Sequence, residues 1–280
     1  MAKTLNRKEQ RAKQLLQRRT EDESALCAAI RAAIRQCFSK LVEMGYGWLY
    51  APEKFRFSDM HNADGLNATL QKLRTAIFML MERHAQFAID TIEDEYGSAA
   101  HIAAGDIINK EQFGLTAKQR IAKYTDRFKY EAEAWIAAGL VLDINRNRLE
   151  RLFCSNAKNP YGNSIFQEAR KRSPLATRLQ SNGKSYGRGQ IISAQGSIER
   201  LAQSMESWAW REAERNIPHV AGWIVGRGSS YPCDLCQSYV GFHKDSIDLP
   251  PYHANCRCWA YPLTLDEYAL LQQRSPSPLL

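Results

Sequence analysis

The sequence predicts a mainly α-helical fold: a helical body followed by a small C-terminal α+β module in which a cysteine cluster supplements the core. Three observations support this prediction. Apolar residues recur at helical spacing through most of the first 215 residues, β-type composition starts only after Pro218, and four cysteines gather between Cys233 and Cys258. A chain of 280 residues is also long enough to bury a hydrophobic core.

Two long helices are expected in the first hundred residues. Residues 1–20 are basic and rich in glutamine, which predicts a flexible or helical basic arm. From residue 21 onward, apolar side chains three or four positions apart predict a helix that Gly45 ends. Residues 48–67 indicate a loop, since they combine a proline with aromatic and Asp/Asn residues. Apolar residues form one stripe again over 64–96, and Gly97 marks the stop of this second helix.

The rest of the helical body is expected to be more interrupted. A connector at 98–114 precedes Thr116, a suitable N-cap for a helix that extends to residue 142. A shorter helical stretch follows at 145–154. Residues 181–189 are rich in Gly, Ser and Asn, which predicts a flexible loop or linker. The last helix of the body covers 192–216 and is closed by a proline.

Two short strands are expected beyond the body, at 220–227 and 258–263, where β-type residues flank a turn-rich segment. The resulting domain organisation is sequential. A basic arm (1–20) precedes the helical body (21–180), the loop or linker (181–189), the C-terminal module (190–263) and a tail (264–280).

Composition and hydropathy argue against a membrane protein. Hydrophobic residues make up 44% of the chain and charged residues 24%, as in ordinary globular proteins. No window approaches the roughly 20 apolar residues that a membrane span requires. The basic N-terminus lacks the apolar core of a signal peptide. The sequence therefore predicts a protein that is neither secreted by the usual route nor embedded in a membrane.

Positive charge is concentrated in two stretches. The chain carries a net charge of +8, while residues 145–215 alone carry +7 and residues 1–19 carry +6. Concentrated basic residues suit a polyanion such as DNA, although a solvated helix face and a basic arm explain them equally well. The candidate nucleic-acid contacts are Arg170, Lys171, Arg172, Arg178, Lys184 and Arg188.

Cysteines fall into two groups. Cys27, Cys37 and Cys154 are isolated, and we expect them only to fill space. The other four lie within 26 residues, in the motifs C-D-L-C at 233–236 and H-A-N-C-R-C at 253–258. A C-x-x-C turn aims two sulfurs at one point, which is half of a tetrahedral zinc site. The second motif supplies the other half, so a structural zinc ion is predicted to staple the module.

The motifs offer five candidate ligands for four positions: Cys233, Cys236, His253, Cys256 and Cys258. If Cys256 and Cys258 lie on a strand, their side chains share one face and both reach the metal. Otherwise His253 and Cys256 complete the site, and Cys258 packs nearby. Disulfides or free thiols in a packed core are the remaining alternatives. A catalytic zinc is not expected, because four protein ligands leave no position for water.

The segment from Trp223 to Pro262 resembles the closing module of tailed-phage minor head proteins, the Mu F-like head-morphogenesis family. The shared pattern runs from a strand tryptophan through C-x-x-C and a glycine to a proline-rich approach, H-x-x-C-R-C and a final proline. Its positions here are Trp223, Cys233, Cys236, Gly241, Pro250, Pro251, His253, Cys256, Arg257, Cys258 and Pro262. The resemblance covers about forty residues, and the first 180 residues carry no assignable motif. One departure from the family pattern is G-R-G-S-S-Y-P before the first cysteine, where an acidic residue is common.

The resemblance implies a non-enzymatic minor head (capsid) protein of a phage or prophage. Such proteins act in head morphogenesis. They are made in the host cytoplasm and enter the procapsid, and so the virion, in few copies. Partners implied are the portal protein, the scaffold or the major capsid protein, with contact to packaged DNA that influences DNA packaging or ejection. No membrane and no small-molecule substrate is implied.

Two other functions compete with this prediction. A zinc-stabilised DNA-binding protein would use the basic stretches directly, with a strongly salt-dependent affinity. A zinc-supported nuclease would use His253 and Asn255, but it also needs a helix after its metal-binding hairpin, and none is expected. Arg257, between two candidate ligands, is better placed for a hydrogen bond or a partner contact than for chemistry.

Overall fold

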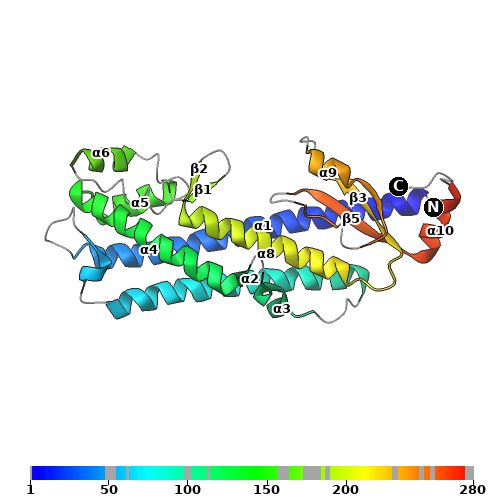
Figure 1. Ribbon diagram of the computed structural model, residues 1–280, viewed down its shortest axis with the longest axis horizontal. Coiled ribbons are helices and arrows are strands. Elements are labelled where there is room, and N and C mark those ends of the chain that lie inside the picture. Colours follow the sequence, from blue (N-terminus) through cyan, green and yellow to red (C-terminus); the bar gives the residue numbers. More distant parts are fainter. Residues whose placement is uncertain are drawn as a thin grey trace. The chain divides into compact units, whose positions relative to one another are not determined.

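The computed structural model describes residues 2–47, 55–60, 63–97, 102–111, 114–156, 164–172, 184–186, 190–228, 233–245, 249–252 and 256–274. It is mainly helical with a small three-stranded sheet near the C-terminus, which confirms the predicted fold class (Figure 1). The elements in chain order are α1 (Ala2–Gly45), η2 (Phe57–Asp59), α2 (Ala63–Tyr96), α3 (Ala104–Asn109), α4 (Ala117–Val141), α5 (Arg146–Asn156), α6 (Ser164–Arg172), β1 (Lys184–Tyr186), β2 (Gln190–Ile192), α8 (Ala194–Arg215), β3 (Gly222–Arg227), α9 (Asp234–Ser238), β4 (Gly241–His243), β5 (Cys258–Leu263) and α10 (Leu265–Arg274).

Helix ends follow local sequence signals. Thr116 caps α4 by accepting a hydrogen bond from the backbone N–H of Gln119 at 3.3 Å, and the Gln119 side chain returns a bond to the Thr116 N–H. This capping box satisfies backbone donors that the first turn of a helix leaves without partners. At the end of α2, Gly97 takes a positive φ of 77°, the left-handed conformation that favours glycine. Both termini were predicted from the sequence.

The chain folds into two compact units, each assembled from segments far apart in sequence. The helical unit contains Cys27–Leu80 and Glu111–Leu201. The module unit contains Met1–Leu26, Met81–Lys110 and Ala202–Leu280. Residues of α1, α2 and α8 therefore belong to both units. This division differs from the sequential domains expected above, because N-terminal residues share a unit with the C-terminal module.

The core of the helical unit is aromatic. Phe38 of α1 stacks on Phe153 of α5 with ring centroids 3.8 Å apart. Trp135 of α4 is fully buried and meets Phe153 and Phe166 edge to face at 5.7 and 4.6 Å. A polar contact completes this unit, because both carboxylate oxygens of buried Glu131 accept the N–H of Ala194, the first residue of α8.

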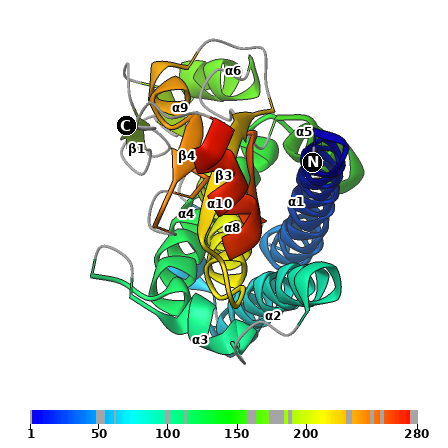
Figure 2. The same ribbon diagram turned by 90° about the vertical axis from the view of Figure 1, so that its right-hand side faces the viewer.

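The module unit is organised around the antiparallel sheet β4-β3-β5, in which Trp223 pairs with His243 on one side and Pro262 on the other. Buried Trp259, Tyr261 and Leu263 of β5 pack in one cluster with Ala12 of α1. The strand α10 follows β5 directly and lies against the sheet as a helix, where Tyr268 stacks on Phe242 at 5.0 Å (Figure 2).

Three parts of the chain differ from their expected structure. The basic arm is a continuous part of α1, with Ala12 and Leu15 buried. The loop or linker at 181–189 overlaps a short hairpin formed by β1 and β2, and the tail contains α10. Sparse apolar residues weaken the helical signal at the N-terminus, and a Gly/Ser-rich composition hides three-residue strands. Among the described residues, none of the helices is long and apolar enough to cross a membrane.

Candidate metal centre

The C-x-x-C motif forms the start of the short helix α9. Cys233 has extended backbone angles (φ −145°, ψ 106°) and caps the helix, since its sulfur accepts a hydrogen bond from the N–H of Cys236 at 3.5 Å. Cys236 therefore lies one turn further on, with its side chain buried. This turn directs the Cys236 sulfur into the module, as the spacing of the motif predicts.

The second motif enters β5. Cys258 is the first residue of this strand and pairs with Arg227 of β3, while Cys256 precedes it by two positions. Residues two apart along extended backbone share one face, and both cysteines are buried. Their side chains accordingly meet the Cys236 side chain from the opposite direction.

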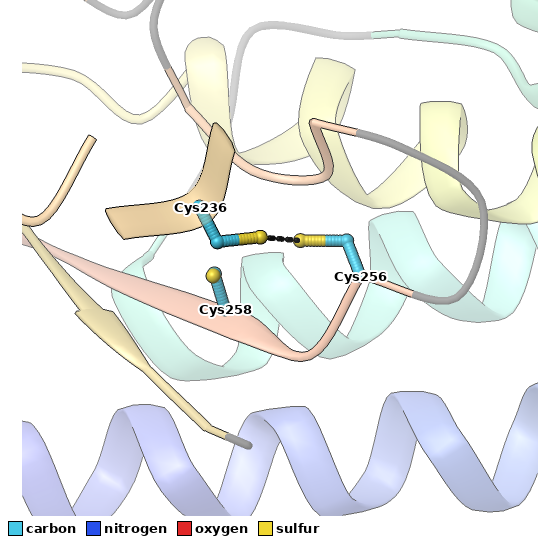
Figure 3. A group of neighbouring side chains, drawn as sticks. All are labelled: Cys236, Cys256 and Cys258. Carbon is cyan, nitrogen blue, oxygen red and sulfur yellow. Dashed lines mark hydrogen bonds between the residues drawn. The ribbon is translucent and has the colours of Figure 1, made fainter. Parts of the chain in front are cut away.

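Three sulfurs converge at one point. Those of Cys236, Cys256 and Cys258 all lie within 4.8 Å of one another, and the Cys236–Cys256 distance is 3.8 Å. Figure 3 shows these two side chains pointing toward each other, with the Cys258 sulfur beside them. Sulfurs at the corners of a tetrahedral zinc site with Zn–S bonds of about 2.3 Å stand about 3.8 Å apart. The arrangement is therefore one that could hold a metal ion.

Protonation within the cluster is uneven. Hydrogen bonds from the Cys258 thiol and from the backbone of Tyr252 and Cys258 lower the pKa of Cys256 to about 5, although burial opposes this shift. Burial raises the pKa of Cys236 to about 11. The hydrogen bond to the Cys256 sulfur, together with burial, raises the pKa of Cys258. Without a cation, the cluster thus favours one thiolate stabilised by two thiols.

The remaining two candidate ligands have different positions. Cys233 is partly buried and packs against the cluster, but its sulfur is not within 4.8 Å of all three others. His253 lies outside the described residues. Of the two ligand sets expected from the sequence, the geometry matches the one in which both Cys256 and Cys258 face the ion. The three clustered cysteines are free thiols, not disulfides.

Aromatic and proline residues enclose the cluster. The ring of Tyr252 stacks on that of Tyr239 with centroids 4.2 Å apart, and Tyr252 packs against the cysteines. Leu249 and Pro250 are buried, and the Pro250–Pro251 peptide bond is cis. An apolar enclosure of this kind limits solvent access to the sulfurs.

Arg257 contacts α1 instead of the cluster. Its guanidinium donates a hydrogen bond to Glu23 at 2.8 Å, and the Glu23 side chain is only 8% exposed. Gln203 of α8 donates to the other carboxylate oxygen at 2.9 Å. The sequence predicted a hydrogen-bonding role for Arg257 but gave no signal for Glu23. This residue lies in an E-D-E-S run that is typical of a solvated helix face.

A group of buried polar residues surrounds this contact within the module unit. His84 of α2 approaches Asp22 with an Nδ1–Oδ1 distance of 2.6 Å. Glu206 of α8 is 2% exposed. Burial and the nearby charges of Asp22 and Glu23 raise the pKa of Glu206 to about 8. The Glu206 carboxyl is therefore mainly protonated at neutral pH, which limits the charge that this region buries.

The candidate nucleic-acid residues do not form a described patch. Lys171 is exposed and pairs with Glu168 on its own helix at 2.9 Å, and Arg172 donates to the carbonyl of Val141 at 3.3 Å. The side chains of Arg170 and Lys184, and the whole of Arg178 and Arg188, lie outside the described residues. No described contact among these residues favours nucleic acid over a solvated surface.

Much of the positive charge near the N-terminus is paired inside the module unit. Lys8 contacts Glu267 at 2.5 Å, and Lys13 contacts Glu9 at 2.6 Å. Arg11 pairs with Glu95 of α2. These pairs reduce the charge that this stretch of α1 presents to a polyanion.

Comparison with known proteins adds no relative, since no protein-family model, curated protein or solved structure matches the chain. The functional argument accordingly depends on the motif and on the geometry of the cysteine cluster.

Proposed function

We propose that residues 222–263, here called the cysteine module, bind one structural zinc ion and that the chain acts as a minor head protein of a tailed phage. The observation that carries the metal assignment is the convergence of three buried sulfurs from two separate motifs. Buried thiols gathered this closely suit a soft cation, and tetrahedral sulfur coordination is typical of zinc.

Cys233 is our candidate for the fourth ligand. It is one turn from Cys236, packs against the cluster and is joined to it by the N-cap hydrogen bond. A side-chain rotation at Cys233 is a smaller change than a rearrangement of the strand that holds Cys258. His253 is the alternative fourth ligand. Either choice gives a closed site of four protein ligands, which is typical of structural and not catalytic zinc.

Zinc would stabilise a module that is otherwise poorly equipped to fold. Its three strands have six, three and six residues, and α9 has five. Elements this short bury little apolar surface, so metal binding replaces part of the missing core. We assign no catalytic role to the cysteine module, and the proposed head protein is a structural component.

Metal analysis tests the zinc site. The full chain, purified without chelator, is expected to contain about one zinc per molecule. Cys236→Ser and Cys256→Ser should each lose the metal. Cys27→Ser is the matched control, because Cys27 is as buried as Cys236 but lies outside the cluster. A wild-type chain that folds fully with no bound metal contradicts the proposed site.

Co-assembly tests the head-protein assignment, which the resemblance of the cysteine module supports. The chain is expressed together with the portal protein encoded in the same genome. We expect it to co-sediment with portal rings or procapsids at physiological salt. Retention on duplex DNA at that salt, without any association with the portal or procapsid, would favour the DNA-binding alternative instead.

A further inference from the structure

Arg257 occupies an unusual position, between two cysteines that face the metal centre. Cys256 and Cys258 turn their side chains toward the cluster, while Arg257 reaches α1 and donates to Glu23 at 2.8 Å. Alternation along extended backbone accounts for the opposite directions. The same three-residue segment therefore touches the candidate ion on one side and the N-terminal helix on the other.

Glu23 depends on this contact. Its side chain is 8% exposed, and its two carboxylate oxygens accept bonds from Arg257 and Gln203. Its sequence neighbour Asp22 and the carboxyl of Glu206 add no positive charge to this region. Removing one partner of a buried ion pair is costly because the remaining charge stays buried. The position of Arg257 thus matters for the packing of α1 in the module unit.

The close contact extends along α1. Gly228, just after β3, leaves no room for a side chain, since an added Cβ would lie 2.0 Å from the carbonyl oxygen of Arg257 and 2.3 Å from Leu16. Lys13 lies over the Trp259 ring at 5.7 Å, and Lys8 donates to the carbonyl of Pro262 at 3.1 Å. Residues 8–23 of α1 therefore pack directly on the strand that carries the metal-facing cysteines.

We infer that metal binding and the docking of residues 8–23 are thermodynamically coupled through the Arg257–Glu23 pair. This inference rests on the proposed zinc site. The ion fixes the turn formed by Cys256 and Cys258, and that turn aims Arg257 at Glu23. By linkage, whatever the ion contributes to docking of α1, the docked α1 contributes to metal affinity. Arg257 is a positioning residue of the site and not a ligand.

The helical unit provides a matched control pair. Arg31 and Glu199 lie 3.4 Å apart with side chains 31% and 8% exposed, compared with 29% and 8% for Arg257 and Glu23. Arg31→Met and Arg257→Met remove the same group from the same degree of burial. Methionine keeps most of the apolar stem, so the comparison isolates the guanidinium.

Zinc affinity is the first measurement, made on the full chain by competition with a chromophoric chelator. Outer-shell partners of metal ligands typically change affinity 10- to 100-fold, and we expect a loss in this range for Arg257→Met. Arg31→Met should stay within about twofold of the wild type. Glu23→Gln, which keeps the shape of the side chain, should weaken zinc binding in the same direction as Arg257→Met.

Hydrogen exchange is the second measurement, made on zinc-loaded protein. We expect amides of residues 8–23 to exchange at least about tenfold faster in Arg257→Met, while those of α4 are unchanged. Residues 8–23 should also lose protection when zinc is removed from the wild type. If Arg257→Met does not fold, Glu23→Gln provides the same two readouts.

The outcomes separate the two proposals. A wild-type chain without zinc affinity removes the zinc site, and with it the coupling. Stoichiometric zinc binding with equal affinities in Arg257→Met and Arg31→Met leaves the site intact and overturns the coupling alone. Unchanged protection of residues 8–23 in Arg257→Met also overturns it.

Discussion

The helical unit and the cysteine module obtain their stability from different sources. In α4, fourteen residues are buried along a helix of 25, and they meet neighbours over a continuous aromatic core. In the module, all six residues of β5 are buried, but the strand has few partners of its own and ends at the sulfur cluster. The helical unit therefore depends on packed apolar area, while the module depends on a few specific contacts around one point.

The largest effect that this comparison predicts follows removal of the metal or of one sulfur. Structural zinc contributes apparent binding free energies of about 10–16 kcal/mol in small zinc-binding peptides, more than the stability of a short sheet. In Cys256→Ser, we expect amides of β3 and β5 to lose protection from hydrogen exchange, while those of α4 keep it. Equal loss of protection in both regions would show that they do not differ in this way.

A deletion in the helical core should give the opposite pattern. Trp135 is fully buried against Phe153 and Phe166, so Trp135→Ala is expected to lower the free energy of unfolding by about 3–5 kcal/mol. Urea unfolding followed by circular dichroism measures this loss, because most of the signal is helical. Zinc content should remain at one per folded chain. Loss of zinc from folded Trp135→Ala would contradict the independence of the two sources of stability.

A pH effect is expected in the module unit from Glu206. Its folded-state pKa is raised from 4.5 to about 8, mainly by burial, so the folded chain holds this proton more tightly than the unfolded chain. The resulting stabilisation is complete below about pH 4.5 and is lost as the pH rises through about 8. Between these values, stability falls by up to about 1.4 kcal/mol per pH unit.

Glu206→Gln isolates this contribution. Urea unfolding of zinc-loaded wild type and variant is measured from pH 5 to pH 9. The variant is expected to gain stability relative to the wild type as the pH rises, because glutamine stays neutral. Parallel stability curves for the two proteins would mean that Glu206 titrates normally.

The smallest predicted effect concerns a single helix cap. Thr116→Ala removes the side-chain acceptor at the start of α4 and should cost about 1 kcal/mol, whereas Thr116→Ser should cost much less. Thermal unfolding of the two variants provides the comparison. A loss in Thr116→Ser as large as that in Thr116→Ala would exclude the cap as the cause.

Local patterns predicted most of the helices and the cysteine cluster. The helix expected over 64–96 begins at Ala63 and ends at Tyr96, and the strand expected at 258–263 is β5. These segments were predictable because their signals lie within the segment itself: apolar periodicity, a cap or a C-x-x-C turn. Cys236, Cys256 and Cys258 were likewise identified by spacing before their geometry was known.

Contacts over long sequence distances were not predictable in the same way. Glu23 and Arg257 are separated by 234 positions, and no pattern near either residue identifies its partner. The N-terminal 20 residues have too few apolar positions to predict burial, although Ala12 and Leu15 are buried by residues more than 200 positions away. Tertiary packing, not local preference, decides the structure of such segments.

The composition of the module unit has a consequence for biosynthesis. This unit joins Met1–Leu26 with Ala202–Leu280, so the ribosome must translate the intervening chain before the two segments can meet. At about 5–20 residues per second, the first segment waits on the order of ten seconds or longer after it leaves the exit tunnel. During that interval the apolar side of the nascent helix is available to chaperones, and folding of this unit is completed only close to chain release.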